Sequence, residues 1–280
     1  MQLSIIIPAF FGEDIFEECL ESLYRSSEDL LGNGNWEILV YNNGFEPGRW
    51  QELQEVFPKI KFYGEGKNVG FSEGNNFLIE KCKGEYILLL NQDVFIKRKV
   101  VEKLIQFLEV NKEYSCVAPQ LRFKSGEIQN SCRPFPTFGL FIKDIFTGGK
   151  SYRSFYFPDK DSEVDQPMAS CLLYRKEVID KLGGFDSNPH FFLFFNDVDL
   201  SYRTKNELGG KSYFLASVYA YHLHGSSTAI LPEFKRLFLW WKGLGRFWYK
   251  TGDNYFWAYF KALIITKLNW LSKVGREIIK

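Results

Sequence analysis

Strand-like apolar runs alternate with helix-like amphipathic segments through the first third of the chain. Four runs have the length and the β-branched or aromatic content of strands buried on both faces, at residues 3–8, 36–41, 60–63 and 86–90. One-faced helical patterns follow the first three, at residues 13–25, 50–57 and 73–81. Because this alternation implies parallel strands joined by right-handed crossovers, we predict an α/β fold: a Rossmann-like layered, mostly parallel sheet with helices on both faces.

The pattern is less regular further along the chain. Strands are predicted at residues 114–119, 167–174 and 217–221, and helices at 177–182 and from 196 toward 209. Residues 133–157 mix Pro, Gly and many aromatic side chains without a clear period. Periodicity alone predicts a hydrophobic loop region there.

The composition is that of a globular protein and argues against several classes. Of 280 residues, 45% are hydrophobic, which is ample for a core, and the net charge of +1 gives no overall attraction to nucleic acid. Five cysteines without C-x-x-C or close His spacing argue against a disulfide framework and a zinc site. The sequence has neither a signal-peptide pattern nor an apolar run of the roughly eighteen residues that a spanning helix needs, so we expect a cytoplasmic compartment.

Polar or glycine-rich stretches follow all four of the early strands, at residues 8–13, 42–44, 67–76 and 91–93. The carboxyl ends of parallel strands meet at one edge, which is where ligands bind in open α/β sheets. After the last of these strands, Asp93 supplies a carboxylate that could hold a cation bridging nucleotide phosphates, although Asn and Asp are also ordinary turn residues. Neither G-x-G-x-x-G after the first strand nor a P-loop is present, which argues against a dinucleotide or P-loop site.

Four stretches together resemble the inverting glycosyltransferases of family 2, in particular their bacterial rhamnosyltransferase-like branch. They are SIIIP at 4–8, KNVGFSEGNN at 67–76, GEYILLLNQDV at 84–94 and GGFDSNPHFFLFFNDVDLSYR at 183–203. The resemblance covers roughly residues 3–228 and implies a GT-A fold. It also implies a nucleoside diphosphate-sugar donor, UDP- or dTDP-linked, a Mn²⁺ or Mg²⁺ cofactor, and a saccharide or lipid-linked acceptor in surface polysaccharide biosynthesis.

The resemblance assigns residues to the donor and the metal. Asp93 and His222 are the expected metal ligands, because the run that begins at His222 fits the family's H-x-x-G-x-S spacing. His224 is the competing histidine. Carboxylate, imidazole and diphosphate oxygens suit Mn²⁺ or Mg²⁺ better than zinc. The expected donor contacts are Pro8, Ala9, Phe10, Glu13, Asn42, Asn68, Gly70, Asn75, Asn91, Gln92 and Asp93.

Asp197 matches the family's general base, which accepts the proton of the acceptor hydroxyl. Acids in the first turn of a helix are also favoured by the helix dipole without any catalytic role, and we interpret Asp199 in that structural sense. The aromatic run before Asp197, at residues 191–195, predicts apolar surroundings for its carboxylate. By resemblance, residues 133–157 would contribute to the acceptor side.

The chain departs from the family pattern at several positions. Phe11 stands where the family usually has Asn, Asn42 where it has an Asp beside the nucleoside, and Asn196 where it has the Glu of a Glu-Asp pair. Asn91 and Gln92 leave Asp93 as the one anionic residue of the metal motif. These changes leave open an alternative function, a catalytically weakened nucleotide-sugar or carbohydrate-binding module.

The composition changes sharply at the C-terminal end. Residues 231–280 carry ten Lys or Arg against three Asp or Glu, together with five tryptophans. Basic side chains interleaved with Trp are typical of interfacial helices at anionic membranes, and packing against the catalytic domain or a second subunit of a homodimer is the alternative. We therefore expect a GT-A domain at 1–228, with a donor half at about 1–94 and an acceptor half at about 95–228. A basic aromatic helical extension at 229–280 would lie on the inner face of the cell membrane.

Overall fold

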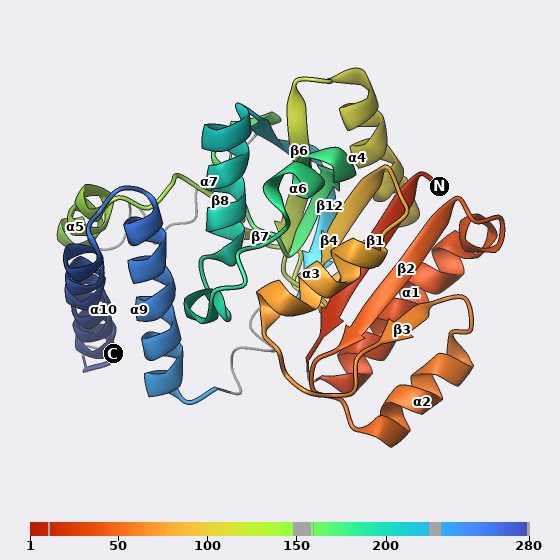
Figure 1. Ribbon diagram of the computed structural model, residues 1–280, viewed down its shortest axis with the longest axis horizontal. Helices are drawn as coiled ribbons and strands as arrows, with labels where there is room; N and C mark the ends of the chain where they lie inside the picture. The colour runs from red at the N-terminus through yellow and green to blue at the C-terminus, as the bar shows by residue number, and fades with distance from the viewer. Residues whose placement is uncertain (11, 148–157, 159, 224–230, 279–280) are drawn as a thin grey trace.

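A ten-stranded mixed sheet forms the centre of the molecule, with helices on both faces and a helix pair at one end (Figure 1). The computed structural model describes residues 1–10, 12–147, 158, 160–223 and 231–278. The strand order is β3-β2-β1-β4-β11-β6-β12-β5, with β7 beside β6 and β9 beside β12. The predicted α/β fold is confirmed.

The first part of the sheet is parallel, as the strand–helix alternation predicts. It consists of β1 (Leu3–Ala9), β2 (Trp36–Asn42), β3 (Lys61–Tyr63) and β4 (Tyr86–Leu90). All five residues of β4 are buried, because the strand lies between β1 and β11 and is covered on both faces. The carboxyl ends of the four strands therefore share one edge, from which the polar loops emerge.

The second part of the sheet mixes directions. β11 (Cys171–Arg175) runs antiparallel between β4 and β6 (Tyr114–Arg122), and β12 (Lys211–His222) runs parallel to β6. Three short strands are antiparallel to their neighbours, namely β5 (Val94–Phe95), β7 (Ile128–Gln129) and β9 (Ser162–Val164). A separate ribbon pairs β8 (Cys132–Arg133) with β10 (Gln166–Pro167).

Some element bounds differ from those predicted. The single strand expected at 167–174 is split between β10 and β11, which belong to different sheets. The connection expected from residue 26 is helical, since α1 (Glu13–Gly32) continues and buries Ser27. β12 begins six residues before the predicted start at residue 217. A register shift after Leu215 interrupts the alternation of buried and exposed side chains along this strand.

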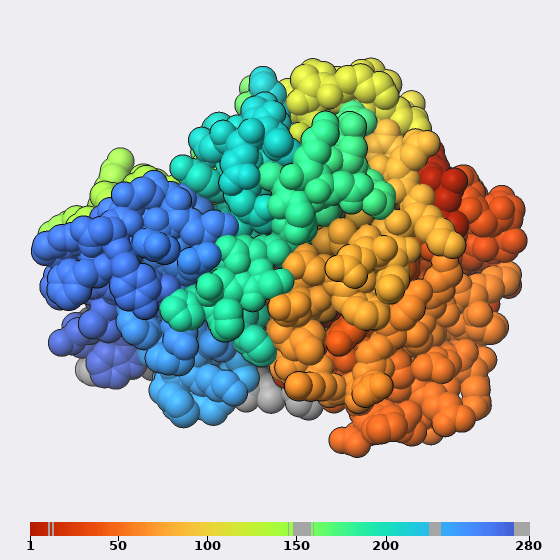
Figure 2. Space-filling view, viewed as in Figure 1, coloured from red at the N-terminus to blue at the C-terminus, as the bar shows by residue number. Residues whose placement is uncertain are grey.

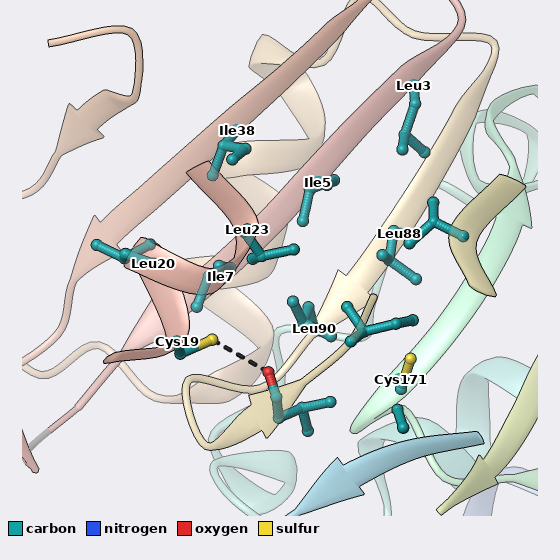
Figure 3. Close-up of a cluster of buried hydrophobic side chains, with 14 of the residues drawn as sticks. Leu3, Ile5, Ile7, Cys19, Leu20, Leu23, Ile38, Leu88, Leu90 and Cys171 are labelled. Atoms are coloured by element: carbon teal, nitrogen blue, oxygen red, sulfur yellow. Dashed lines mark hydrogen bonds between the residues drawn. The ribbon is translucent and has the colours of Figure 1, made fainter. Parts of the chain in front are cut away.

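Two hydrophobic clusters sandwich the sheet. Alternate residues of β1 serve the two sides, with Ile5 and Ile7 in one cluster and Ile6 in the other. The first cluster, part of which Figure 3 shows, is covered by α1, α2 (Pro47–Val56) and α4 (Arg98–Val110). The second is covered by α3 (Phe71–Lys81), α6 (Lys176–Leu182) and α7 (Asn196–Leu208).

A third cluster joins the C-terminal helices to the rest of the protein. It packs α9 (Glu233–Lys250) and α10 (Tyr255–Ile278) against α5 (Phe138–Phe146) and against Phe191, Phe195 and Val198. Trp248 is buried there and its Nε1 donates to Pro136 O over 2.9 Å. One face of the helix pair thus packs against the catalytic domain, which was the alternative to membrane binding for this segment.

Not every tryptophan of this segment lies in the cluster. Trp240 and Trp241 are half-buried, whereas Trp257 and Trp270 are 51% and 40% exposed. Among the described residues, no helix is both long and apolar enough to span a bilayer.

Candidate active site

Strand pairing brings the two predicted metal ligands together. β5 pairs with the end of β12, so that His222 lies opposite Val94 and Leu223 N donates to Asp93 O over 3.0 Å. His222 Nε2 then lies 3.4 Å from Asp93 Oδ1, and these side chains are only 3% and 5% exposed. Two ligands of one octahedral cation at about 2.1 Å would be about 3 Å apart, so the observed spacing suits a shared ion.

Gln129 contacts the second ring nitrogen of His222 and thereby favours one tautomer of the imidazole. Its Oε1 lies 2.7 Å from His222 Nδ1, and because an amide oxygen can only accept, Nδ1 carries the proton. In the neutral imidazole, His222 Nε2 then carries a lone pair that faces the Asp93 carboxylate, also an acceptor. Two facing acceptors in a buried position are favourable only with a cation or a shared proton between them. The donor set therefore fits a divalent metal ion.

Gln92 holds the loop that follows β1. Its Oε1 accepts from Phe10 N and its Nε2 donates to Phe10 O over 2.9 Å, so the amide is committed to the backbone of that loop. Gln92 is 4% exposed. Gln92 therefore fixes the shape of the loop after Pro8 and Ala9.

Asn42 folds the loop after β2 around its own side chain. Its Oδ1 accepts from Gly44 N at 3.0 Å and Phe45 N at 2.7 Å, while Nδ2 donates to Phe45 O at 3.0 Å. A carboxylate has no donor for the third bond. This gives a physical reason for asparagine at a position where the resembled family usually has aspartate.

Asn68 and Asn75 shape the start of α3. Asn68 Oδ1 accepts from Gly70 N, and Asn75 Nδ2 donates to Phe71 O, both over 2.9 Å. Gly70 has a φ of +90°, and a Cβ there would lie 2.7 Å from the ring of Phe192, so only glycine fits. Asn75 is 1% exposed and turned into the helix, whereas Asn68 faces solvent at the edge of the sheet.

Asn91 anchors the end of β4. Its Nδ2 donates to Ser170 Oγ over 3.1 Å and its N donates to Ser170 O over 2.9 Å. Val94 N in turn donates to Asn91 O over 3.2 Å, which closes the turn that carries Asp93. Asn91 thus fixes the backbone that carries Asp93.

Asp197 lies among polar side chains. Its Oδ2 accepts from Gln166 Nε2 over 3.2 Å and lies 3.8 Å from Arg133 Nη2, while Oδ1 accepts from Val198 N over 2.9 Å. Arg133 is brought there by the β8–β10 pairing, which sets it opposite Gln166. The predicted apolar surroundings of Asp197 are therefore wrong, because the preceding aromatic residues pack elsewhere.

One short segment connects the two candidate centres. Gln129 contacts His222, and Arg133, four residues later, lies beside Asp197. A chain of that length spans at most about 14 Å between its terminal Cα atoms. The candidate metal ligands and the candidate base are therefore contacted from the two ends of one short segment.

The residue immediately before α7 is strained. Phe195 has a φ of +67°, unique among the described non-glycine residues, and a bulky residue in this region costs on the order of 1–3 kcal/mol. Its ring is buried 5.4 Å from that of Trp240, and this packing holds the conformation. The strain directs the chain into Asn196 and Asp197 at the first turn of the helix.

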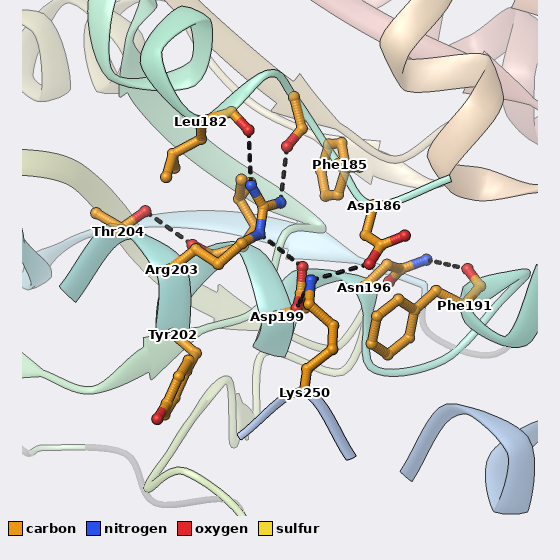
Figure 4. Close-up of polar contacts among 12 residues, drawn as sticks. Leu182, Phe185, Asp186, Phe191, Asn196, Asp199, Tyr202, Arg203, Thr204 and Lys250 are labelled. Carbon is orange, nitrogen blue, oxygen red and sulfur yellow. Dashed lines mark hydrogen bonds and ion pairs between the residues drawn. The ribbon is translucent and has the colours of Figure 1, made fainter. Parts of the chain in front are cut away.

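Asp199, by contrast, is occupied in a structural network (Figure 4). Arg203 Nε donates to Asp199 Oδ2 over 2.8 Å, and the guanidinium also donates to Leu182 O at 2.9 Å and Gly184 O at 2.7 Å. These contacts tie α7 to the end of α6. They agree with the structural interpretation of Asp199.

Cations from α9 complete this network. Lys250 Nζ lies 2.9 Å from Asp186 Oδ2, and Arg246 lies 3.2 Å from the same oxygen. Burial would raise the pKa of the Asp186 carboxyl, but the hydrogen bonds from Lys250 and Asn188 N and the charges of Lys250 and Arg246 outweigh it and lower that pKa. α9 is thereby tied to the segment that precedes the candidate base.

The segment between α6 and α7, which contains η1 (Pro189–Phe191), is held from two sides. Phe71 N at the start of α3 donates to Phe192 O over 3.0 Å. On the other side, α9 approaches so closely that a Cβ on Gly243 would lie 2.6 Å from Phe194 O. In Figure 2 this segment, in green, fills the space between blue α9 and orange α3.

Three side chains of this site were not predicted from the sequence: Gln129, Arg133 and Gln166. They lie on two-residue strands, which carry no measurable periodicity, and Arg133 begins the stretch without a clear pattern. Two predicted positions lie outside the described part of the chain, namely His224 and the side chain of Glu13, as does Phe11, where the chain departs from the family pattern.

Comparison with known proteins identifies the family of the chain. The family model described as "Glycosyl transferase family 2" matches residues 4–183. N-acetylglucosaminyl-diphospho-decaprenol L-rhamnosyltransferase of Mycobacterium tuberculosis is 22% identical over 214 residues, which cover 70% of this chain and 69% of that protein.

Two solved structures share the fold. The mannosyltransferase of Pyrobaculum calidifontis in complex with GDP-Man and Mn²⁺ aligns with a TM-score of 0.58 at 12% identity, covering 99% of this chain and 80% of the other. GalNAc-T7 with UDP, GalNAc and Mn²⁺ also aligns with a TM-score of 0.58 at 12% identity, covering 79% of this chain and 43% of that one. This chain thus spans less than half of the GalNAc-T7 chain. Because the family model matches more than half of the present sequence, the chain belongs to glycosyltransferase family 2 and is an enzyme of that family.

Proposed function

We propose that this glycosyltransferase moves a sugar, with inversion, from a UDP- or dTDP-linked donor to a saccharide or lipid-linked acceptor in surface polysaccharide biosynthesis. The observation that carries the proposal is the buried pair of Asp93 and His222, whose facing acceptor atoms lie 3.4 Å apart at the carboxyl edge of the sheet. That edge also carries the loops after β1, β2 and β4. A nucleotide is the ligand that would use all of them together.

Asp93 and His222 would hold Mn²⁺ or Mg²⁺ in this reaction. No group of three or more His, Cys, Asp and Glu side chains that suits a metal occurs among the described residues, so two protein ligands are expected. Such sites leave coordination positions for substrate phosphate oxygens and water. The bound ion would supply charge neutralisation to the departing nucleoside diphosphate.

Asp197 would act as the general base. Its carboxylate takes the proton of the acceptor hydroxyl as that oxygen bonds to the anomeric carbon. The bond from this carbon to the phosphate oxygen breaks, and the nucleoside diphosphate leaves with the electron pair. Gln166 and Arg133 would orient the carboxylate, which is 14% exposed and hence accessible to an acceptor.

A lipid-linked acceptor is supported by the mycobacterial relative, whose name specifies a diphospho-decaprenol substrate. It is also supported by the basic C-terminal segment, from which we propose peripheral association with the inner face of the cell membrane.

The test uses UDP- and dTDP-sugars with Mn²⁺ and a soluble saccharide acceptor panel. We expect Asp197→Asn to lower transfer by about 10²–10⁴-fold while nucleotide affinity is unchanged. Asp180→Asn is the matched control, because its carboxylate makes an exposed pair with Lys176 on α6. Equal loss of transfer and nucleotide affinity in Asp197→Asn would instead make Asp197 a structural residue. Failure of the wild-type chain to consume any of these donors would contradict the proposed function.

A further inference from the structure

The two sides of α10 differ sharply. One side is buried in the third hydrophobic cluster through Ala258, Tyr259, Ala262 and Ile265. The opposite side consists of large apolar residues that are between 40% and 68% exposed, namely Phe256, Trp257, Phe260, Leu263, Trp270 and Leu271. At about 100° per residue, these six positions fall within an arc of about 140°. We name them the outer face of α10.

The aromatic part of the outer face is contiguous. The rings of Phe256 and Phe260 stack 5.9 Å apart, and Trp257 lies 5.6 Å from Phe256 and 5.7 Å from Phe260. Single exposed apolar residues are normal on soluble proteins, but a joined aromatic patch marks a contact surface.

The position of one lysine indicates what covers this surface. Lys267 is exposed and, by helical spacing, lies near the middle of the same arc, between Leu263 and Trp270. The core of a protein–protein interface is depleted in lysine, because the charge would have to be desolvated there. At a lipid headgroup region the same side chain can extend past the apolar contacts to a phosphate, and tryptophan is enriched at that depth.

The C-terminal segment carries the positive charge that attraction to an anionic surface requires. Residues 231–280 carry ten Lys or Arg and three Asp or Glu, a net charge of +7, which leaves −6 for the other residues of a chain whose total is +1. Arg246, Lys250 and Lys261 are held in ion pairs with Asp186, Asp199 and Asp253. Lys235 and Lys267 are exposed, and each Lys near an anionic leaflet adds about 1 kcal/mol of attraction.

We propose that the outer face of α10 lies in the headgroup region of an anionic lipid bilayer. The aromatic rings reach the acyl boundary and Lys267 contacts lipid phosphate. α10 thus acts as an in-plane anchor, which requires no membrane-spanning helix. The proposal deepens the proposed function and rests on it in one respect only: a lipid-linked acceptor would be delivered to the site from this surface.

Vesicle sedimentation of the full chain tests the proposal. We expect binding to vesicles of phosphatidylcholine and phosphatidylglycerol at low salt, partial release at high salt, and weak binding to pure phosphatidylcholine. The double variant Trp257→Ser/Phe260→Ser should lower the partition coefficient by roughly tenfold or more, since it removes two large apolar contacts. Lys267→Glu should lower only the part of the vesicle binding that high salt releases.

A matched control is Val56→Ser/Val110→Ser, which removes apolar side chains that are 55% and 73% exposed on α2 and α4. This control should bind vesicles like the wild type. Equal binding by both double variants, or no binding of the wild type at low salt, would overturn the proposal. So would a dimer, detected by sedimentation velocity, that Trp257→Ser/Phe260→Ser dissociates. Donor consumption with soluble acceptors, measured without vesicles, tests the proposed function separately and should be unchanged in these variants.

Discussion

Lys250 Nζ lies 2.6 Å from Asp199 Oδ1, which joins the last turn of α9 to the first turn of α7. The Asp199 side chain is 2% exposed, so its charge depends on protein partners rather than on water. Asp197 lies two residues earlier on the same turn. The C-terminal helix pair is therefore part of the structure that positions the proposed base.

Lys250→Met should destabilise the protein and reduce transfer. Loss of one partner of a buried ion pair costs on the order of 3 kcal/mol. Arg203 still partly neutralises Asp199 in this variant, and Arg246 partly neutralises Asp186. Urea unfolding and transfer rates measure the two effects. The control is Lys261→Met, whose pair with Asp253 is about a quarter to a third exposed and should be worth less than about 1 kcal/mol. Equal destabilisation by both substitutions would contradict the role of Lys250.

Gln129→Leu should weaken metal binding without unfolding the protein. The substitution removes the acceptor that fixes the tautomer of His222, and loss of such a partner typically lowers metal affinity about 10–100-fold. It also removes the buried Gln129 Nε2, which has no hydrogen-bond partner within the described structure. Calorimetric titration with Mn²⁺ in the presence of UDP or dTDP measures the affinity.

Gln129→Glu keeps an acceptor for His222 Nδ1 and should retain metal binding better than Gln129→Leu. The exposed Gln51→Leu on α2 serves as a control and should resemble the wild type. Unchanged Mn²⁺ affinity in Gln129→Leu would show that the contact does not orient His222 for a metal.

Asn42→Asp should destabilise the loop after β2 even though the two side chains have the same shape. The carboxylate cannot donate to Phe45 O, which is left opposite a negative oxygen in a buried position, at a cost of roughly 1–3 kcal/mol. The control is Asn33→Asp, because Asn33 is exposed and only accepts a bond from Asn35 N. Urea unfolding at pH 7 compares them. A stability of Asn42→Asp equal to that of the wild type would reject this explanation for asparagine.

Mild acid should weaken the attachment of α10 through His190. Burial, followed by the charges of Lys242 and Arg246, lowers the pKa of His190, whose ring contacts Tyr259 on α10. The folded state therefore favours the neutral ring. In the unfolded state the ordinary pKa of a histidine, about 6.5, applies, so below that pH the unfolded state binds more protons than the folded state. Stability is therefore lost from about pH 6.5 downward, until the folded pKa is passed.

Thermal unfolding at pH 8 and pH 5.5 tests whether stability falls as the pH is lowered. The wild type should lose more stability between the two values than His190→Gln, which cannot titrate at that position. An equal loss in both proteins would assign the pH dependence to other groups.

The fold could be predicted largely from local patterns, whereas the site could be predicted only in part. β1 and β4 are continuous apolar runs because they are buried on both faces, and Asp93 follows directly from the end of β4. Arg133 and Gln166 reach the site through the pairing of two-residue strands that are distant in sequence, and Gln129 through a two-residue strand beside β6; strands this short carry no local pattern. Similarly, inward-facing Lys250 and outward-facing Lys267 are indistinguishable in composition, so the two faces of the helix pair became visible only after packing was known.

Calorimetric titration of the wild-type chain and of Asp93→Asn with UDP and dTDP, each in Mn²⁺ and in EDTA, tests the central claim most directly. The account predicts that the wild type binds one of these nucleotides in Mn²⁺, with at least about tenfold loss of affinity in EDTA. Asp93→Asn should show the weaker affinity in both conditions while its urea unfolding remains cooperative. Nucleotide binding that is indifferent to EDTA and to Asp93→Asn, or no binding of either nucleotide, would contradict a metal-assisted donor site at Asp93 and His222.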